Sequence, residues 1–389
     1  MTDSFDKTQT GWEGSSQRVL GISHNGVGLG HVMRVSGLLR TLALGPRGAD
    51  VLQATSSDVL SISLAAGVPA VRLGSFEDTA FVGEEIPANI RKISSHLNAL
   101  ELYRRTNRAV IQVLMDEFRP NVVVVDAFPG GPLESLEAID MRRTLSVLIE
   151  AAFTHEDFVR EMAHYSDRFD ERLIAWPQEL SGHYPGRPSS EATWTGFVTY
   201  GGAERLTRQQ AREFLGLYSG AKYCLLNIGS TQGSVAHENL RDIFAACDAL
   251  GFIPVVAEAP LWNRRSPDQY IDTGASELRL RSLNLGRLMP AFDLIISTIG
   301  RNSFVECVRA NVPLVWIDKA RFSKTRHSDQ TGLARVATDL QLGLVQTVGS
   351  NWHSSISTAV EMAPTSQELL AIFRYDGNQS VRSLLEGLA

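Results

Sequence analysis

The residues with the clearest chemical meaning follow one short apolar run in the C-terminal third of the chain. The run over 294–296 is typical of a strand buried on both faces, and it breaks at Gly300 before a helical pattern begins. The start of a helix offers free backbone N–H groups and a partial positive charge, and Asn302 and Ser303 add side-chain donors there. Glu306 lies one turn further on, where a carboxylate can accept hydrogen bonds from two ribose hydroxyls. The spacing therefore suits a nucleoside diphosphate, although an ordinary strand–helix unit with a solvated Glu306 would show the same pattern.

A second strand-to-helix turn, near the start of the chain, carries groups that suit acid–base chemistry. Arg18–Ser23 is typical of a strand, and it runs into a glycine-rich turn that contains Gly28 and Gly30. Glycine lets the backbone turn sharply and approach a ligand closely. His31 and Arg34 follow directly, at the start of an apolar helical pattern. Because histidine titrates near neutral pH, His31 is the natural candidate for a group that accepts a proton.

The segment from Gly300 to Glu306, with the later pair Asp329-Gln330, resembles the nucleotide-sugar signature of GT-B glycosyltransferases. The resemblance implies that the small polar residues hold the phosphates, the glutamate holds the ribose and the acidic–glutamine pair holds sugar hydroxyls. Many members carry histidine where this chain has Thr298, so one phosphate contact differs here. The implied donor site consists of Gly229, Ser230, Thr298, Gly300, Arg301, Asn302, Ser303, Glu306, Asp329 and Gln330.

The N-terminal glycine loop resembles the acceptor-side loop of the same enzymes, and its Gly-His-Val-Met-Arg string is also similar to nucleotide-sugar hydrolases of that fold. The resemblance places the acceptor cleft between this loop and the donor half. Trp194–Val198 resembles the link between the two halves in these enzymes. We expect the acceptor side to include His24, Gly28, Gly30, Arg34 and His155.

His31 and Asp126 are the expected catalytic residues. His31 matches the loop histidine of the resembling enzymes, and packing at the helix start is the alternative role. Asp126 ends the strongest apolar strand, Val122–Val125, and the carboxyl end of a parallel strand is where ligands meet an α/β sheet. It is placed to orient His31 through the second ring nitrogen, or else to cap the following helix.

Composition is that of a large enzyme and argues against several other classes. The chain has 389 residues, 43% of them hydrophobic and 21% charged, which is enough for two cores. Its formal net charge of −6 makes nucleic acid an unexpected partner. The sequence contains no Asp-x-Asp pair, and its three cysteines lack metal-ligand spacing, so we expect neither a metal nor another cofactor. The polar residues 1–17 lack a hydrophobic signal region and read as a disordered tail, which favours a cytoplasmic location.

The pattern along the chain predicts an α/β protein of the GT-B type, with two Rossmann-like, doubly wound parallel-sheet domains facing across a cleft. We expect an acceptor domain over 18–195, a nucleotide-sugar domain over 203–389, and a last helix that crosses back to the first domain. A Gly-, Pro-, Ser- and Thr-rich stretch, Pro185–Gly202, predicts the boundary. A long helix is expected over 89–118. The strands expected in the first half are Val19–Ser23, Val51–Thr55, Pro69–Leu73, Val122–Asp126, Thr144–Ile149 and Leu173–Trp176.

The resulting functional hypothesis is an inverting, metal-independent glycosyltransferase that uses a UDP- or TDP-type sugar donor. Inversion and metal independence are implied by the resemblance, and the acceptor is a small molecule, a peptide or a lipid-linked carrier. A nucleotide-sugar hydrolase with His31 activating water is the alternative, and a catalytically silent binding partner of another enzyme is a third. The sequence does not specify the oligomeric state. A solvated helix face, or weak contact with the inner face of a membrane, would account for Arg91, Lys92, Arg104, Arg105 and Arg108.

Overall fold

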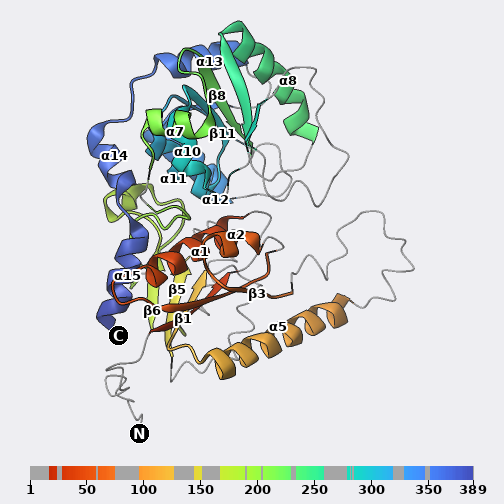
Figure 1. Cartoon of the computed structure of the whole chain (residues 1–389), viewed down its shortest axis with the longest axis vertical. Helices are drawn as coiled ribbons and strands as arrows, with labels where there is room; N and C mark the ends of the chain where they lie inside the picture. The colour runs from red at the N-terminus through yellow and green to blue at the C-terminus, as the bar shows by residue number, and fades with distance from the viewer. Residues whose placement is uncertain are drawn as a thin grey trace.

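Two parallel β-sheets, one above the other, organise the chain (Figure 1). The structure is a computed structural model, and side chains are described for all the residues it describes except 96–104, 234–239 and 328–330. The described residues are 17–23, 29–57, 60–74, 96–126, 144–150, 167–188, 191–202, 205–228, 234–257, 278–280, 282, 284–318, 328–346 and 351–388. The predicted α/β architecture with two doubly wound sheets is confirmed.

The first sheet places its strands, within the described residues, in the order β3-β2-β1-β4-β5-β6-β7. The four consecutive valines of β4 explain its central place, since β-branched side chains suit a strand that is buried on both faces. The direction of winding reverses between β1 and β4, and ligands of α/β sheets bind beyond the carboxyl ends of strands at such a switch point. The strands are β1 (Arg18–Ser23), β2 (Asp50–Thr55), β3 (Ala70–Arg72), β4 (Val122–Asp126), β5 (Leu145–Glu150), β6 (Glu171–Ile174) and β7 (Thr193–Trp194).

The second sheet repeats this plan. Its order is β10-β9-β8-β11-β12-β13 in the described part of the chain, so the switch point lies between β8 and β11. The apolar run recognised in the sequence forms β11, which is buried along its whole length. The strands are β8 (Lys222–Asn227), β9 (Phe252–Ala257), β10 (Leu278–Leu280), β11 (Leu294–Thr298), β12 (Leu314–Ile317) and β13 (Leu344–Gln346).

Helices cover both sheets and begin at the two switch points. Helix α1 starts at Gly30 after β1, and its apolar stripe, which includes Val35 and Leu39, packs on the first sheet. Helix α11 starts at Arg301 after β11 and ends at Asn311, whose positive φ of 54° stops the helix in the left-handed region. The helices, with the short 3₁₀ segments η3 and η4, are α1 (Gly30–Ala43), α2 (Ser61–Ala65), α5 (His96–Phe118), η3 (Gln178–His183), α7 (Arg208–Leu215), α8 (Ser234–Ala249), α10 (Leu285–Leu288), η4 (Met289–Ala291), α11 (Arg301–Ala310), α12 (Ser328–Asp339), α13 (Trp352–Glu361), α14 (Gln367–Arg374) and α15 (Gly377–Leu388).

An aromatic cluster joins the two halves through one continuous core. Trp176, which follows β6, lies 5.0 Å from Phe197 and is stacked 6.4 Å from Phe304, measured between ring centroids. Phe304 belongs to α11, and it also meets Phe373 of α14 at 5.7 Å. All four rings are almost fully buried. Helix α11 is therefore held from the first half of the chain as well as from its own sheet.

The last helix returns to the first sheet. Helix α15 packs against α1, and its Val381 and Leu385 are completely buried in the same core as Val35 (Figure 1). The buried Asn378 at the start of α15 donates to the Thr199 carbonyl at 2.8 Å and accepts from the Thr199 N–H at 3.0 Å. The segment between the two sheets is thereby bonded to the helix that covers the first sheet.

A buried arginine fixes the donor-side helix to the same segment. Arg309, near the end of α11, is 2% exposed. Its guanidinium donates to the Thr199 hydroxyl at 3.0 Å and to the Gly202 carbonyl at 2.8 Å, and also to the carbonyls of Phe373 and Tyr375 at 2.5 Å and 3.0 Å. Because these acceptors lie in the link and at the C-terminal end of α14, this side chain ties α11 to both segments.

Three local features differ from the sequence predictions. The strand predicted over Leu173–Trp176 ends two residues earlier, because Trp176 turns into the shared core and donates to the Leu180 carbonyl at 2.8 Å. Strand β7 extends the first sheet inside the stretch expected to be a link. Helix α7 was not predicted, although the reciprocal capping bonds between Thr207 and Gln210 are a recognisable start signal. Helix α5 begins at His96 in the described part of the chain. Residues 89–95 of the predicted helix lie outside the described residues.

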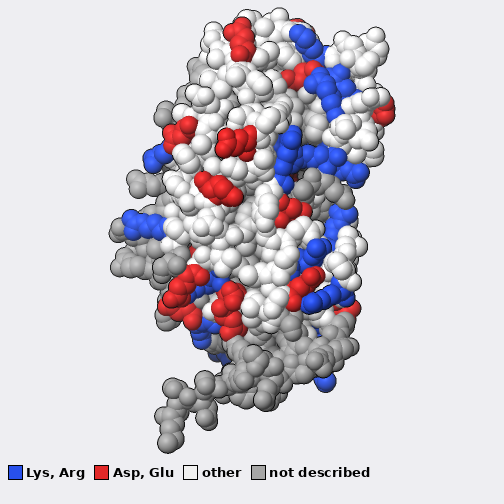
Figure 2. All heavy atoms as spheres, turned by 90° about the vertical axis from the view of Figure 1, so that its left-hand side faces the viewer, with Lys and Arg blue, Asp and Glu red and all other residues white. Residues whose placement is uncertain are grey.

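The surface shows both signs of charge. Figure 2 views the side along which α14 and α15 run, and acidic and basic side chains are both spread over it. The arginines expected on the long helix belong to α5, where Arg105 and Arg108 are exposed, while Arg91 and Lys92, and the side chain of Arg104, lie outside the described part. Among the described residues, no helix has the length and apolarity to cross a membrane.

Candidate active site

The turn from β11 into α11 is built to leave backbone donors free. Gly300 occupies the N-cap position in an extended conformation, with φ −136° and ψ 155°, and no side chain caps the first turn. A Cβ atom placed on Gly300 would meet nothing within 4 Å, so the turn faces open space. Free N–H groups and the positive end of the helix dipole therefore face a gap of the kind that an anion fills.

An asparagine that the sequence reasoning missed supports this turn. Asn227 ends β8 at the switch point, and its amide donates to the Ser297 hydroxyl at 3.2 Å and to the Ser303 hydroxyl at 3.4 Å. The bond to Ser303 connects the central strand with the first turn of α11. Thr298 is buried at the end of β11, directly before the turn. A polar residue at the end of an apolar strand was the available signal for Asn227.

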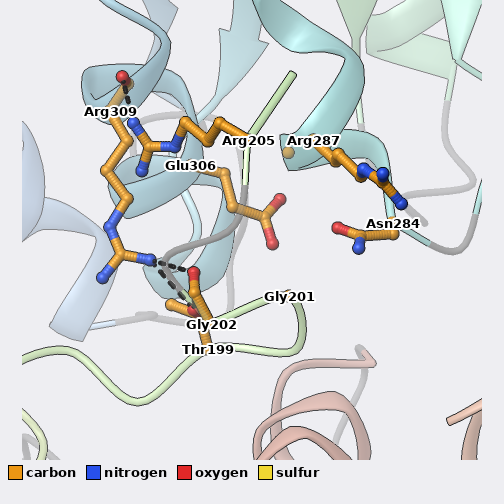
Figure 3. Close-up of a pocket in the computed structure, with 9 residues that line it drawn as sticks. Thr199, Gly201, Gly202, Arg205, Asn284, Arg287, Glu306 and Arg309 are labelled. Atoms are coloured by element: carbon orange, nitrogen blue, oxygen red, sulfur yellow. Dashed lines mark hydrogen bonds between the residues drawn. The ribbon is translucent and has the colours of Figure 1, made fainter. Parts of the chain in front are cut away.

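Glu306 points into a pocket between α10, α11 and the link (Figure 3). The site is shaped to receive it, since a Cβ atom on Gly286 would lie only 2.8 Å from the Glu306 Cγ. Burial raises the pKa of Glu306 to about 7, against the opposing charges of Arg309 and Arg205. The pocket is lined by Thr199, Gly201, Gly202, Arg205, Asn284, Gly286, Arg287, Glu306 and Arg309.

The Glu306 carboxylate is poised to accept hydrogen bonds. Figure 3 shows it between the arginines of the link and α11 on one side and Asn284 on the other, with Gly201 and Gly202 across the pocket. Within the described residues it has no hydrogen-bond partner. A carboxylate beside an open space can accept hydrogen bonds from hydroxyl groups that approach it.

On the opposite side, His31 and Asp126 meet. His31 lies in the first turn of α1, and its Nδ1 is 3.2 Å from Oδ1 of Asp126, the last residue of β4. The Asp126 side chain is completely buried, whereas His31 is 20% exposed. Arg34, one turn further along α1, donates to the same Oδ1 at 3.0 Å. Burial acts to raise the pKa of Asp126, but Arg34 and His31 outweigh it, so the pKa lies below its ordinary value.

The two sides touch across the gap between the sheets. The Asn302 amide on α11 donates to the Gly30 carbonyl at the start of α1, at 3.3 Å. Arg301 contributes to lowering the pKa of Asp126 and opposes the rise that burial causes in the pKa of Tyr184. The donor turn and the His31–Asp126 pair, which are far apart in the sequence, therefore form one site.

Several predicted site residues cannot be placed. His24, Gly28, His155, Gly229 and Ser230 lie outside the described residues. Asp329 and Gln330 lie in the first turn of α12, whose side chains there are not described. Within the part of the chain that the structure describes, no group of three or more His, Cys, Asp or Glu residues is arranged to hold a metal ion.

Comparison with known proteins bears on the fold. No protein-family model and no curated protein matches the chain. The glycosyltransferase SnogD from Streptomyces nogalater is 19% identical with a TM-score of 0.64, and the match covers 96% of this chain and 100% of SnogD. The chain has the GT-B fold. The spinosyn forosaminyltransferase SpnP shares it at 14% identity and a TM-score of 0.66, covering 96% of this chain and 99% of SpnP.

A third GT-B structure was solved with a nucleotide. The spinosyn rhamnosyltransferase SpnG, complexed with thymidine diphosphate, is 17% identical with a TM-score of 0.57, and the match covers 95% of this chain and 100% of SpnG. At these identities the likeness establishes the arrangement of the two sheets. The chemistry of this chain has to be argued from its own residues.

Proposed function

We propose that this GT-B protein transfers a sugar from a nucleoside diphosphate sugar to a hydroxyl or another nucleophile of a small molecule, a peptide or a lipid-linked carrier. One observation carries the proposal: the uncapped N-terminus of α11 and the Glu306 carboxylate on the same helix lie opposite the His31–Asp126 pair, with Asn302 contacting Gly30 between them. The helix N-terminus suits a diphosphate, and the Glu306 carboxylate suits the hydroxyls of a ribose. The His31–Asp126 pair suits removal of a proton from the acceptor hydroxyl. The fold is shared with SnogD, a glycosyltransferase, SpnP, a forosaminyltransferase, and SpnG, a rhamnosyltransferase, and this supports the same class of reaction.

The proposed step is a single displacement with inversion. The acceptor oxygen forms a bond to the anomeric carbon as its proton passes to Nε2 of His31, while Asp126 holds Nδ1. The bond between the anomeric carbon and the diphosphate oxygen breaks, and the nucleoside diphosphate leaves with the electron pair. The N–H groups of α11 and the side chains of Arg301 and Asn302 stabilise its charge. We propose that these groups suffice without a metal, and that the protein works in the cytoplasm.

The test is release of nucleoside diphosphate from a panel of UDP- and TDP-sugars, with and without cell extract as a source of acceptors. Release that requires extract, with the sugar recovered on a second molecule, would support the transferase. Fast release without extract would replace it by the hydrolase suggested by the Gly-His-Val-Met-Arg string. If the protein binds a nucleotide sugar but releases no nucleoside diphosphate under either condition, it would be a catalytically silent binding partner of another enzyme.

Gly300→Val is expected to abolish nucleotide binding without harming the fold. The position faces open space and has a backbone conformation that valine adopts readily, so the free energy of unfolding should change by less than about 1 kcal/mol. The added methyl groups occupy the place of the phosphates, so calorimetric affinity for UDP and TDP should fall by more than about tenfold. Gly387→Val, also in open space, is the matched control. Equal affinities in both variants would move the phosphate site elsewhere.

Glu306→Gln is expected to weaken UDP binding by about tenfold at pH 8, because a neutral amide replaces a charged acceptor. In the parent, the ionised fraction of a carboxyl with a pKa of about 7 falls from about 0.9 at pH 8 to about 0.1 at pH 6. Affinity should therefore fall about tenfold over that range in addition to any titration of UDP itself. Glu306→Gln lacks this component, and the exposed Glu361→Gln keeps it. If the affinity for UDP changed with pH in the same way in the parent and in Glu306→Gln, Glu306 would not be part of the binding site.

A further inference from the structure

Arg34 contacts the carboxylate of the His31–Asp126 pair, and the reaction proposed above gives this arginine no role. It lies one turn after His31 on α1, so both side chains reach the end of β4 from the same helix face. Both contact a single oxygen, Oδ1 of Asp126, with Nδ1 of His31 at 3.2 Å and Nη1 of Arg34 at 3.0 Å. The side chain of Arg34 is only 4% exposed and that of Asp126 is fully buried. Burying a guanidinium carries a desolvation penalty, and its pairing with the Asp126 carboxylate offsets that penalty.

The surroundings of the pair are rich in charge. Arg301 approaches from α11 and contributes to lowering the pKa of Asp126. Tyr184, just after η3, interacts with the charges of Arg301, Arg34 and Glu150, the last residue of β5. Burial raises the pKa of Tyr184, which keeps this phenol neutral at physiological pH. Within this group, Asp126 contacts both His31 and Arg34 through Oδ1.

The physical consequence concerns the proton on His31. A buried carboxylate facing an imidazole alone favours the ion pair, in which the ring carries both protons and cannot accept a third. A guanidinium on the same oxygen neutralises that carboxylate and repels a second positive charge on the ring. Asp126 can then still accept a hydrogen bond from Nδ1 and fix the tautomer, and Nε2 is the atom that takes the proton in the proposed reaction.

We propose that Arg34 is a positioning residue, which pairs with Asp126 so that this carboxylate orients His31 without holding the ring in its doubly protonated form. The inference deepens the proposed function and rests on it for the role of His31. The contact among the three side chains stands independently of that function. A direct measurement of the His31 ring therefore distinguishes failure of this inference from failure of the proposed reaction.

The experiment is an NMR titration of the His31 ring between pH 5 and pH 9.5, with the signal assigned by its loss in His31→Gln. Arg34→Met should move the titration midpoint upward by about one pH unit or more, because a cation has left a buried carboxylate beside the ring. Arg34→Lys keeps the charge and should keep the midpoint within about 0.3 of a unit of the parent. Arg40→Met, on the same helix and outside the site, is the matched control.

The kinetic counterpart is the pH profile of kcat/KM with the donor identified above. At pH 7, kcat/KM of Arg34→Met should be about tenfold or more below that of the parent. Near pH 9 most of this difference should disappear, because the acidic limb of the kcat/KM profile moves with the His31 midpoint. An unmoved NMR midpoint in folded Arg34→Met would overturn the inference, as would an equal loss of activity at every pH. Should Arg34→Met not fold, Arg34→Gln, which keeps a hydrogen-bond donor without the charge, gives the same two readings.

Discussion

His31→Gln is expected to lower kcat by about 10²–10⁴-fold while changing the affinity for the donor less than threefold. The Nδ1 atom of His31 lies 3.2 Å from Oδ1 of Asp126, and Nε2 is the nitrogen that we propose as the base. Glutamine has a similar reach but cannot accept a proton at neutral pH. The loss should therefore fall on the chemical step and leave the ribose and phosphate contacts on α11 unchanged. Single-turnover kinetics with the donor, and calorimetry with the nucleoside diphosphate, separate the two effects.

The control for this variant is His353→Gln, at an exposed position on α13. It should keep both kcat and the donor affinity. Asp126→Asn is a second probe, since an amide preserves the shape of the side chain but cannot stabilise a protonated ring. If His31→Gln turned over within threefold of the parent, the base would have to be another residue.

Arg309→Met is expected to reduce the free energy of unfolding by about 3 kcal/mol or more. The arginine is 2% exposed and donates to four oxygens on two segments, the link and the end of α14, so methionine fills the space but removes four hydrogen bonds. Since Thr199 and Gly202 belong to the link, the loss should also loosen α11 against the first half of the chain. Urea unfolding followed by tryptophan fluorescence measures the first effect, because Trp176 lies in the shared core.

A matched substitution separates this network from the loss of an arginine as such. Arg374→Met changes an exposed guanidinium at the end of α14, close to the same connections, and should cost less than about 0.5 kcal/mol. Similar losses for Arg309→Met and Arg374→Met would show that the four bonds contribute little. A second effect of Arg309→Met is expected on the affinity for the donor, since Arg309 and Glu306 line the same pocket.

The sequence predicted the parts of the fold that rest on local pattern. The valine run of β4 and the apolar run of β11 are readable because strands buried on both faces need continuous β-branched or apolar residues. Placement of His31 at the start of a helix and of Glu306 one turn into another also follows from local signals. The roles assigned to these two residues stay predictions until they are tested.

The sequence pointed to the contact between His31 and Asp126, but not to other contacts between residues that are distant along the chain. Arg34 and Asp126 are 92 positions apart, and Asn302 and Gly30 are 272 apart. Neither residue type nor spacing indicates that Arg34 and His31 will contact the same carboxylate. The network around Arg309 is of the same kind, since its acceptors are backbone carbonyls and a hydroxyl that carry no sequence signal.

The return of α15 to the first sheet has a consequence for how the protein is made. Val381 and Leu385 fill the core beneath α1, yet the ribosome delivers them after the whole second sheet. At about 5–20 residues per second, the strands of the first sheet wait roughly 10–40 seconds for these side chains after Trp194 has been synthesised. Throughout that interval the face of α1 that packs against α15 lacks its native cover. We therefore expect synthesis to depend on chaperones that cover this face until α15 has been made.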